Sequence, residues 1–280
     1  MKLFKKSTDI SEFIAFRKKD GVKIGFVPTM GALHAGHLSL IGFAREAGEL
    51  VVCSIFVNPM QFNDKDDYEK YPTTLEQDIN LLEESGCDIV FIPSVAEMYP
   101  NGTHPKKVYP LGYLETILEG KYRPGHFQGV CMVVDRLLSV IVPDHIYLGQ
   151  KDLQQCLVIR KLTSLIGSSA ETVICPTQRE ADGLAMSSRN LRLNQEVRKE
   201  AVRLYETLEF IRQEIHPGYL QDLKERARQY LTSTGFRVDY LEIADTDTLE
   251  VQEEWDGKKR LVALVAAFLH KVRLIDNILI

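Results

Sequence analysis

The sequence lacks the features that are typical of membrane, secreted and nucleic-acid-binding proteins. It contains no apolar run of about 18 residues that would predict a transmembrane helix, and its first residues do not form the apolar core of a signal peptide. A net charge of −5 argues against a surface for nucleic acids. The chain has no internal repeat and no low-complexity segment. We therefore expect a cytoplasmic protein that binds neither membranes nor nucleic acids.

Cysteine is scarce, and its five positions form no Cys-x-x-Cys pair. Most of the five stand among apolar neighbours, which predicts buried, reduced thiols: Cys53, Cys87, Cys131, Cys156 and Cys175. Apolar residues make up 45% of the 280 residues and charged residues 26%, as in ordinary globular proteins. This length suffices for one large or two moderate domains.

Over the first two thirds of the chain, short apolar runs alternate with helical patterns. The predicted strands are 22–27, 50–57, 88–92, 145–148 and 171–175. The predicted helices between them are 37–47, 74–85, 126–142 and 152–166. Strands that are apolar on both faces and separated by helices indicate an α/β fold with a Rossmann-like parallel sheet. Ligands of such folds bind beyond the carboxyl ends of the strands.

The pattern changes after about residue 176. A charged amphipathic stretch predicts a helix over 194–215, and a second predicted helix, 220–231, precedes Gly235, a suitable C-terminal cap. Further strands are predicted at 238–243, 261–269 and 271–278. We therefore expect two domains, a Rossmann-like domain over 1–176 and a smaller α+β unit, a lid or second domain, over 177–280.

The most informative segment is Pro-Thr-Met-Gly-Ala-Leu-His-Ala-Gly-His at 28–37. It joins a predicted strand to a helix, so His34 and His37 stand where backbone N–H groups and the helix dipole attract phosphate. Gly31 and Gly36 let the backbone come close to a ligand, and histidine adds donors near neutral pH. The pattern predicts a nucleoside triphosphate site. Two other interpretations are ordinary helix-start residues and metal ligands, the latter disfavoured because no third His or Cys stands nearby.

Two further segments offer substrate contacts. Gln61, which follows the second strand in Asn-Pro-Met-Gln-Phe-Asn, can both donate and accept when it fixes a small polar substrate. Considered alone, it would more often be a solvent-exposed turn residue. Arg123 and His126 belong to a basic, glycine-rich loop over 120–127 and suit a carboxylate or phosphate, with a solvated surface loop as an equal alternative.

Two more segments indicate phosphate binding. In Gly-Gln-Lys-Asp-Leu-Gln-Gln at 149–155, Lys151 can reach a phosphate as a point charge, whereas Asp152 is a candidate helix N-cap. Gln155 lies one turn into the predicted helix and is expected to face the same crevice as Lys151. In the segment 179–190, two hydroxyls and an arginine form a candidate phosphate clamp, the alternative being a polar linker.

Taken in order, these blocks closely resemble the pantoate–β-alanine ligase (pantothenate synthetase) family of nucleotidyltransferases of the His-x-Gly-His type. The matching blocks, within 28–190, are Pro-Thr-Met-Gly-Ala-Leu-His-x-Gly-His, Asn-Pro-x-Gln-Phe, Arg-Pro-Gly-His-Phe, Gly-x-Lys-Asp-x-Gln-Gln and Arg-Glu-Ala-Asp-Gly-Leu-Ala-Met-Ser-Ser-Arg-Asn. The resemblance implies that ATP and (R)-pantoate give a pantoyl adenylate and pyrophosphate, after which β-alanine attacks the adenylate to give pantothenate and AMP. It also implies Mg²⁺ with ATP as co-substrate, small-molecule partners and a homodimer.

The resemblance further implies roles for individual residues. The catalytic residues would be His34, His37 and Lys151, acting on the nucleotide phosphates. The ATP site would be lined by Met30, Gly31, Ala32, Leu33, His34, Ala35, Gly36, His37, Gly149, Gln150, Lys151, Asp152, Gln178, Met186, Ser187, Ser188 and Arg189.

The implied substrate contacts are fewer. Gln61 and Gln155 would hold pantoate, Gln61 would also lie near β-alanine, and Asp78 would be a neighbour of the metal ion. Two positions depart from the family pattern: Thr73 replaces an arginine near the substrate entrance, and Gln178 replaces an aliphatic residue whose backbone contacts adenine. Each departure affects a position where affinity could shift, but neither removes a residue expected to act in the chemistry.

The residue types fit the first step of this reaction. A carboxylate nucleophile is already ionised at neutral pH, so the step needs positioning and charge neutralisation rather than a general base. That explains a site rich in His, Lys, Ser and Arg; the sequence does not separate proton donation by His37 from hydrogen bonding. Two alternatives stay open: a nucleotidyltransferase with a phosphorylated acceptor, and a non-catalytic nucleotide-binding protein. A tRNA-binding synthetase is disfavoured by the acidic charge balance.

Overall fold

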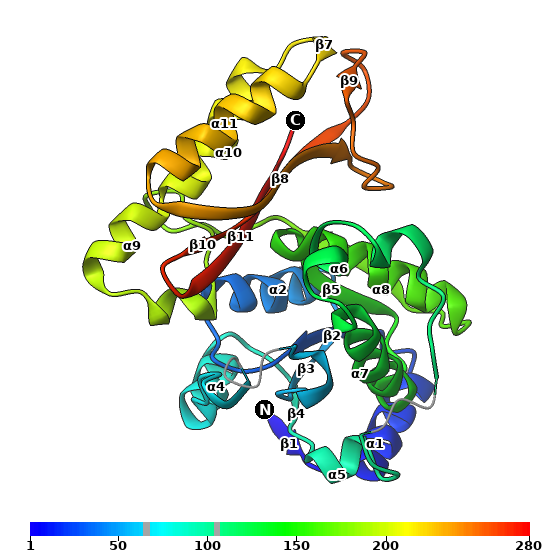
Figure 1. Ribbon diagram of the computed structural model, residues 1–280. Coiled ribbons are helices and arrows are strands. Elements are labelled where there is room, and N and C mark those ends of the chain that lie inside the picture. The colour runs from blue at the N-terminus through cyan, green and yellow to red at the C-terminus, as the bar shows by residue number, and fades with distance from the viewer. Residues whose placement is uncertain (64–67, 104–106) are drawn as a thin grey trace. The chain divides into compact units, whose positions relative to one another are not determined.

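The computed structural model describes residues 1–63, 68–103 and 107–280 (Figure 1). Two compact units share the chain. The first comprises Met1–Gly149 and Gln155–Cys175, and the second comprises Gln150–Gln154 and Pro176–Ile280. The short segment Gln150–Gln154 therefore groups with the second unit although the first unit flanks it in the sequence.

The first unit is built on a six-stranded parallel sheet with the strand order β1-β4-β3-β2-β5-β6. Its strands are β1 (Lys2–Phe4), β2 (Ile24–Thr29), β3 (Leu50–Ile55), β4 (Ile89–Phe91), β5 (His145–Gly149) and β6 (Glu171–Cys175). β3, β2 and β5 are neighbouring strands that run parallel, so the loops that follow them leave the sheet at the same edge. The predicted α/β fold with a parallel sheet is confirmed.

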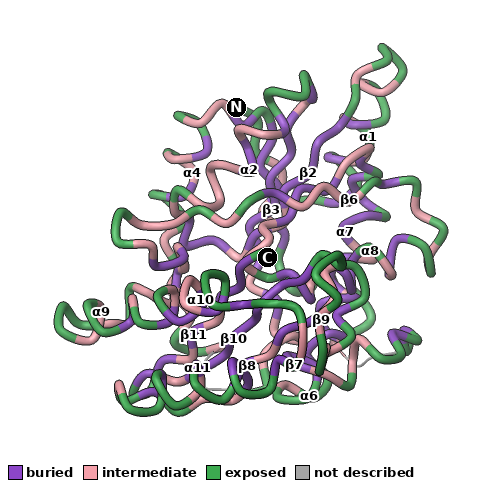
Figure 2. The backbone as a smooth tube through the Cα atoms, turned by 90° about the horizontal axis from the view of Figure 1, so that it is seen from above, coloured by how far each residue is buried: buried purple, intermediate pink, exposed green. Residues whose placement is uncertain are grey.

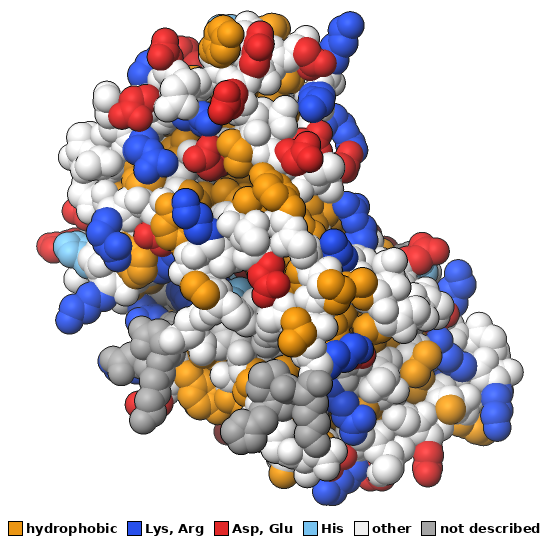
Figure 3. Space-filling model, turned by 45° about the vertical axis from the view of Figure 1, so that its right-hand side comes forward, with side chains coloured by type: hydrophobic (Ala, Val, Ile, Leu, Met, Phe, Trp, Pro, Cys, Tyr) orange, Lys and Arg blue, Asp and Glu red, His pale blue; other side chains and the backbone are white. Residues whose placement is uncertain are grey.

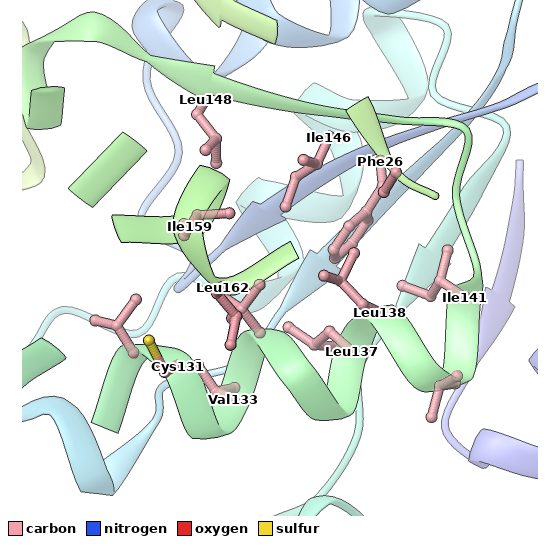
Figure 4. Close-up of a cluster of buried hydrophobic side chains, with 14 of the residues drawn as sticks. Phe26, Cys131, Val133, Leu137, Leu138, Ile141, Ile146, Leu148, Ile159 and Leu162 are labelled. Carbon is pink, nitrogen blue, oxygen red and sulfur yellow. The ribbon is translucent and has the colours of Figure 1, made fainter. Parts of the chain in front are cut away.

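Alternate side chains of the strands enter two different cores. On one face, Phe26 of β2 and Ile146 of β5 pack with α1 (Ser7–Lys19), α7 (His126–Ile141) and α8 (Leu153–Leu165). Figure 4 shows Leu137, Leu138 and Ile141 of α7 directed at Phe26 and Ile146.

On the opposite face, Val27 and Val51 pack with α2 (Ala35–Glu46) and α4 (Leu75–Glu84). Fully burying one such side chain stabilises the fold by about 1.5–3 kcal/mol. The two faces together fix the sheet between helices and so fix the positions of its loops.

The second unit is an antiparallel sheet with the order β11-β10-β8, covered by two helices. Its elements are α9 (Gln195–Ala201), α10 (Arg203–Glu214), β7 (Gly218–Tyr219), α11 (Gln221–Ser233), β8 (Phe236–Asp245), β9 (Glu254–Trp255), β10 (Leu261–Leu269) and β11 (Val272–Leu279). Leu208 of α10 and Leu231 of α11 pack on Ala263 and Val265 of β10. β7 and β9 form a separate antiparallel pair.

Three local features differ from the sequence prediction. The predicted helix 194–215 is interrupted at Val202, whose φ of −60° and ψ of −27° remain helical, so the break is one of hydrogen bonding. The predicted loop 120–127 begins within a short helix, α6 (Leu118–Tyr122). β1 was not predicted, because a three-residue strand shows no periodicity of its own, and α1 was not predicted either.

Burial follows this architecture. Figure 2 shows buried backbone along β2 and β3 and exposed backbone around α9. All five cysteines are buried and free, as predicted. On the face drawn in Figure 3, acidic and basic side chains are interspersed. None of the helices in the described parts of the chain combines the length and apolarity needed to cross a bilayer.

Candidate active site

The turn between β2 and α2 has a tightly determined conformation. Gly31 and Ala32 both adopt positive φ angles, +81° and +50°, and a Cβ atom on Gly31 would lie 2.9 Å from Oδ2 of Asp78. Asp78, only 1% exposed in the first turn of α4, accepts hydrogen bonds from the backbone N–H of Ala32 (2.9 Å) and of Leu33 (2.8 Å). The Thr74 hydroxyl donates to the same carboxylate at 3.1 Å. Asp78 therefore holds the turn in a conformation that an alanine rarely adopts.

His34 and His37 cap the helix that follows this turn. His34 is the N-cap residue of α2, and its Nδ1 accepts from the backbone N–H of Gly36 at 3.1 Å. Nδ1 of His37 in turn accepts from the backbone N–H of His34 at 3.3 Å. Since both Nδ1 atoms accept, each neutral ring carries its proton on Nε2. The two rings, 4.1 Å apart, thus offer Nε2–H donors at a helix N-terminus.

The amide of Gln61 is oriented by Asn58, which is 1% exposed at the end of the β3 loop. The Asn58 amide nitrogen donates to Oε1 of Gln61 (3.1 Å) and to the backbone carbonyl of Gly129 (3.0 Å). Its oxygen accepts from Tyr99 and from the backbone N–H of Met60. With Oε1 occupied in this way, Gln61 presents its Nε2–H₂ donor, which lies 2.9 Å from Sδ of Met30. The side chain therefore suits an oxygen atom of a substrate.

Helix α7 also holds the loop that carries Gln61. Nδ1 of His126 lies 2.7 Å from the backbone carbonyl of Gln61, and Nε2 of His126 lies 3.0 Å from Nη1 of Arg123. A carbonyl can only accept, so Nδ1 of His126 carries the proton and Nε2 accepts from Arg123. Gly129 makes the close approach of the helix possible, since a Cβ atom there would lie 2.0 Å from the carbonyl oxygen of Met60. His126 and Arg123, predicted as anion contacts, thus position Gln61.

In the second unit, the Lys151 loop is held by the last strand. Gln150–Asp152 form a 3₁₀ turn, η3, and the Asn277 amide of β11 donates to the carbonyls of Gln150 (2.8 Å) and Lys151 (3.0 Å). Nε2 of Gln150 donates to Oδ1 of Asn277 at 3.1 Å. Nζ of Lys151 lies 3.7 Å from the carboxylate of Asp152, which stands immediately before α8. The loop backbone is thus fixed at two carbonyls, that of Gln150 and that of Lys151.

The segment 179–190 is a folded turn rather than a bare linker. Arg179 and Ala185 form an antiparallel bridge, and the carbonyl of Gln178 accepts from the backbone N–H of Met186 at 3.0 Å. Ser187 caps the 3₁₀ helix η4 (Ser188–Arg192) by accepting from the backbone N–H of Arg189 at 3.2 Å.

An ion pair closes the base of this segment. Arg179 donates to both oxygens of Asp276 at 2.6 and 3.0 Å, and Asp276 is 2% exposed. Burial raises the pKa of Asp276, while the hydrogen bonds from Arg179 and from the Asn277 backbone oppose that rise. Arg198 pairs with Asp182 at 2.8 Å and lowers the pKa of that carboxyl.

The predicted site residues therefore fall into two groups, one in each unit. The first unit carries Met30, Gly31, Ala32, Leu33, His34, Ala35, Gly36, His37, Gln61, Asp78, Gly149 and Gln155. The second unit carries Gln150, Lys151, Asp152, Gln178, Met186, Ser187, Ser188 and Arg189.

Both oxygens of Asp78 accept from N–H groups of the turn, which gives this carboxylate a structural role; the metal contact implied by the resemblance stays a prediction. Within the described residues, no group of three or more His, Cys, Asp or Glu side chains is arranged to hold a metal ion.

Sequence reasoning missed Asn58, Asp276 and Asn277 as positioning residues. Asn58 stood inside a recognised block, but only Gln61 was singled out there. In the predicted strand 271–278, Asp276 and Asn277 are adjacent polar residues between the apolar residues 274–275 and Ile278, and that interruption was the available signal.

Comparisons with known proteins find similar chains of about the same length. The sequence profile of the family described as pantoate-beta-alanine ligase matches residues 2–279. A pantothenate synthetase of Cytophaga hutchinsonii is 45% identical over 270 residues, which cover 95% of each chain. The crystal structure of pantothenate synthetase from Thermus thermophilus superposes with a TM-score of 0.88 at 40% identity and 99% coverage of both chains.

A further solved structure is similar over the same length. The pantoate-beta-alanine ligase from Francisella tularensis, solved in complex with beta-gamma ATP and beta-alanine, gives a TM-score of 0.81 at 37% identity. The match covers 100% of the present chain and 97% of that chain.

Proposed function

The chain belongs to the pantoate–β-alanine ligase family and catalyses ATP-dependent ligation of pantoate to β-alanine, and we propose that the reaction passes through a pantoyl adenylate. A carboxylate oxygen of pantoate attacks the α-phosphorus of ATP, and the bond to pyrophosphate breaks. The neutral amine of β-alanine then attacks the acyl carbon, AMP leaves with the bonding electrons, and the nitrogen loses a proton. The product, pantothenate, assigns the chain to pantothenate biosynthesis.

The capped pair His34 and His37 is the observation that carries this proposal. Their Nε2–H groups stand at the N-terminus of α2, where the helix dipole also favours negative charge. Charge builds up on the α-phosphate and on the departing pyrophosphate during adenylation, so donors that are already in place stabilise the transition state. We assign His34 and His37 to these phosphates, and Lys151, Ser187, Ser188 and Arg189 to the two outer phosphates, which leave as pyrophosphate.

Pantoate is assigned to the two glutamines of the first unit. Gln61 offers a donor whose direction is fixed by Asn58, and a fixed donor suits the carboxylate or hydroxyl oxygens of pantoate. Gln155, in the first turn of α8, is the second assigned contact, and β-alanine is assigned to the neighbourhood of Gln61. Proper placement of the carboxylate matters most here, because no base is needed to ionise it.

Magnesium enters this proposal only with ATP. Phosphate oxygens and water are the hard oxygen ligands that Mg²⁺ prefers, and Asp78 is kept as a proposed neighbour of the ion. We further propose that the protein acts in the cytoplasm as a homodimer, which light scattering would test against the 31.9 kDa mass of one chain.

The test is exchange of labelled pyrophosphate into ATP with β-alanine left out. Exchange that requires pantoate is expected, and H37A or K151A should lower its rate by about 10²–10³-fold without loss of fold, as when one oxyanion donor is removed. H216A and K258A, which remove exposed side chains of the same types, are the controls. Absence of exchange in folded wild-type protein would contradict the adenylate, and wild-type rates in H37A would contradict the assigned role.

A further inference from the structure

Two buried polar residues of β11 join both phosphate-binding segments of the second unit. Asp276 and Asn277 are each 2% exposed, and apolar residues flank them on both sides in the strand. Asn277 holds the loop that carries Lys151, and Asp276 holds Arg179 at the base of the segment that carries Ser187. Through this one dipeptide the two segments acquire a fixed geometry.

The side-chain amide of Asn277 has a hydrogen-bond partner for each of its hydrogens and for its oxygen. Its nitrogen has two hydrogens, and these go to the carbonyl oxygens of Gln150 and Lys151; its oxygen accepts from Gln150. No other side-chain type of this size can donate twice and accept once in that arrangement. These contacts fix the backbone of the loop that carries the lysine.

Asp276 completes the connection on the other side. Its Oδ1 accepts from the Asn277 backbone N–H (2.8 Å) and from Arg179, while Oδ2 accepts from Arg179 at 2.6 Å. Arg179 also donates to the carbonyls of Asn277 (3.1 Å) and Gly183 (3.0 Å), and its guanidinium lies over the ring of Tyr205. A planar, bidentate arginine pair is directional, so it fixes orientation as well as distance.

We propose that Asp276 and Asn277 are positioning residues that hold the Lys151 loop and the 179–190 segment in one triphosphate-binding geometry. They touch no substrate themselves. The proposal rests on the assignment of Lys151, Ser187 and Arg189 to the ATP phosphates. It predicts that damage to the pair weakens recognition of the outer phosphates and leaves recognition of the nucleoside monophosphate intact.

N277D is the sharpest variant, because it keeps the size of the side chain and one acceptor. It places a carboxylate oxygen where the amide nitrogen had donated to the carbonyls of Gln150 and Lys151, so the loop is repelled rather than held. The affinity for ATP is expected to fall about 10- to 100-fold, the range for loss of contacts to a charged group. The affinity for AMP is expected to change by less than about twofold.

The control breaks a comparable ion pair that does not touch either segment. Asp239 of β8 accepts from Nε of Arg273 at 2.8 Å and is 10% exposed, so D239N tests the effect of loosening the same sheet. ATP and AMP affinities of wild type, N277D, N277A and D239N would be measured by titration calorimetry, with thermal unfolding recorded for each. D239N is expected to bind both nucleotides as the wild type does.

Several outcomes would overturn the proposal. These are equal losses of ATP and AMP affinity in N277D, a matching ATP loss in D239N at equal stability, unchanged ATP affinity in N277D, and a wild type that binds ATP no more tightly than AMP. Selective ATP loss in N277D, with or without the same loss in N277A, would support it. Pyrophosphate exchange in the wild type tests the proposed function separately. Absence of exchange would contradict the adenylate intermediate, whereas selective loss of ATP binding in N277D would still support the positioning role.

Discussion

Asp78 offers the most direct test of how the histidine turn is built. D78N replaces one carboxylate oxygen by an NH₂ group that faces a backbone N–H of the turn, so one hydrogen bond is lost and two donors oppose each other. D78A removes all three hydrogen bonds and leaves two backbone N–H groups buried.

The magnitude follows from the kind of bond that is lost. A hydrogen bond to a charged group contributes about 1.5–3 kcal/mol, and a buried donor left unsatisfied costs about 1–3 kcal/mol. We therefore expect D78N to lower the free energy of unfolding by about 2–4 kcal/mol and D78A by about 3–5 kcal/mol. Against a total of about 5–15 kcal/mol for a typical domain, both losses are large.

Urea unfolding at pH 7 measures these differences, and E76Q is the matched control. Glu76 lies in the same first turn of α4 and is exposed, so E76Q removes the same helix-dipole charge without touching the turn. A D78N variant as stable as E76Q would refute the assigned role. If that stable variant also required more Mg²⁺ for activity, Asp78 would instead belong to the metal ion.

Three further predictions concern other parts of the fold. G129A, whose Cβ would meet the Met60 carbonyl, should lower the free energy of unfolding by about 1–3 kcal/mol in urea and weaken pantoate binding more than ATP binding in calorimetry. The five cysteines should stay unlabelled by Ellman's reagent at pH 7.5 until the protein unfolds, because burial raises the pKa of Cys175, for example, to about 11. Burial acts to raise the pKa of Asp144, but the hydrogen bond from the backbone N–H of Ile24 and the charge of Lys18 outweigh burial, so the pKa is lowered. The ionised carboxylate therefore stabilises the fold above about pH 4, and this stabilisation is lost as the pH falls. D144N should therefore melt below the wild type at pH 7, and the difference in Tm should close toward pH 3.

The regular elements of the fold followed from the sequence where burial alone determines them. The strand 261–269 agrees with β10 at both ends, because its apolar run is uninterrupted. β1 was not predicted, because Lys2, Leu3 and Phe4 form a strand only by pairing with β4. Such an edge strand has no local periodicity, so its existence depends on a partner that is distant in the sequence.

The sequence segments that carry the candidate site could be predicted, but the contacts that position their side chains could not. His34 and His37 were expected at a strand-to-helix junction, but histidine is not among the preferred N-cap residues, and the reciprocal cap requires the folded turn. The support of that turn comes from Asp78, 46 positions from Ala32, and the support of Lys151 comes from Asn277, 126 positions away. Contacts of this range depend on tertiary packing, which local patterns do not encode.

The grip of Asn277 on Lys151 also has a consequence for biosynthesis. During translation the lysine leaves the ribosome 126 residues before the asparagine that fixes its loop. At about 5–20 residues per second, the interval is on the order of 6–25 s. Over that time a nascent chain can form the parallel sheet and the histidine cap while its lysine loop has no anchor. The arrival of β11 thus sets the moment at which the lysine loop of a newly made polypeptide acquires its anchor.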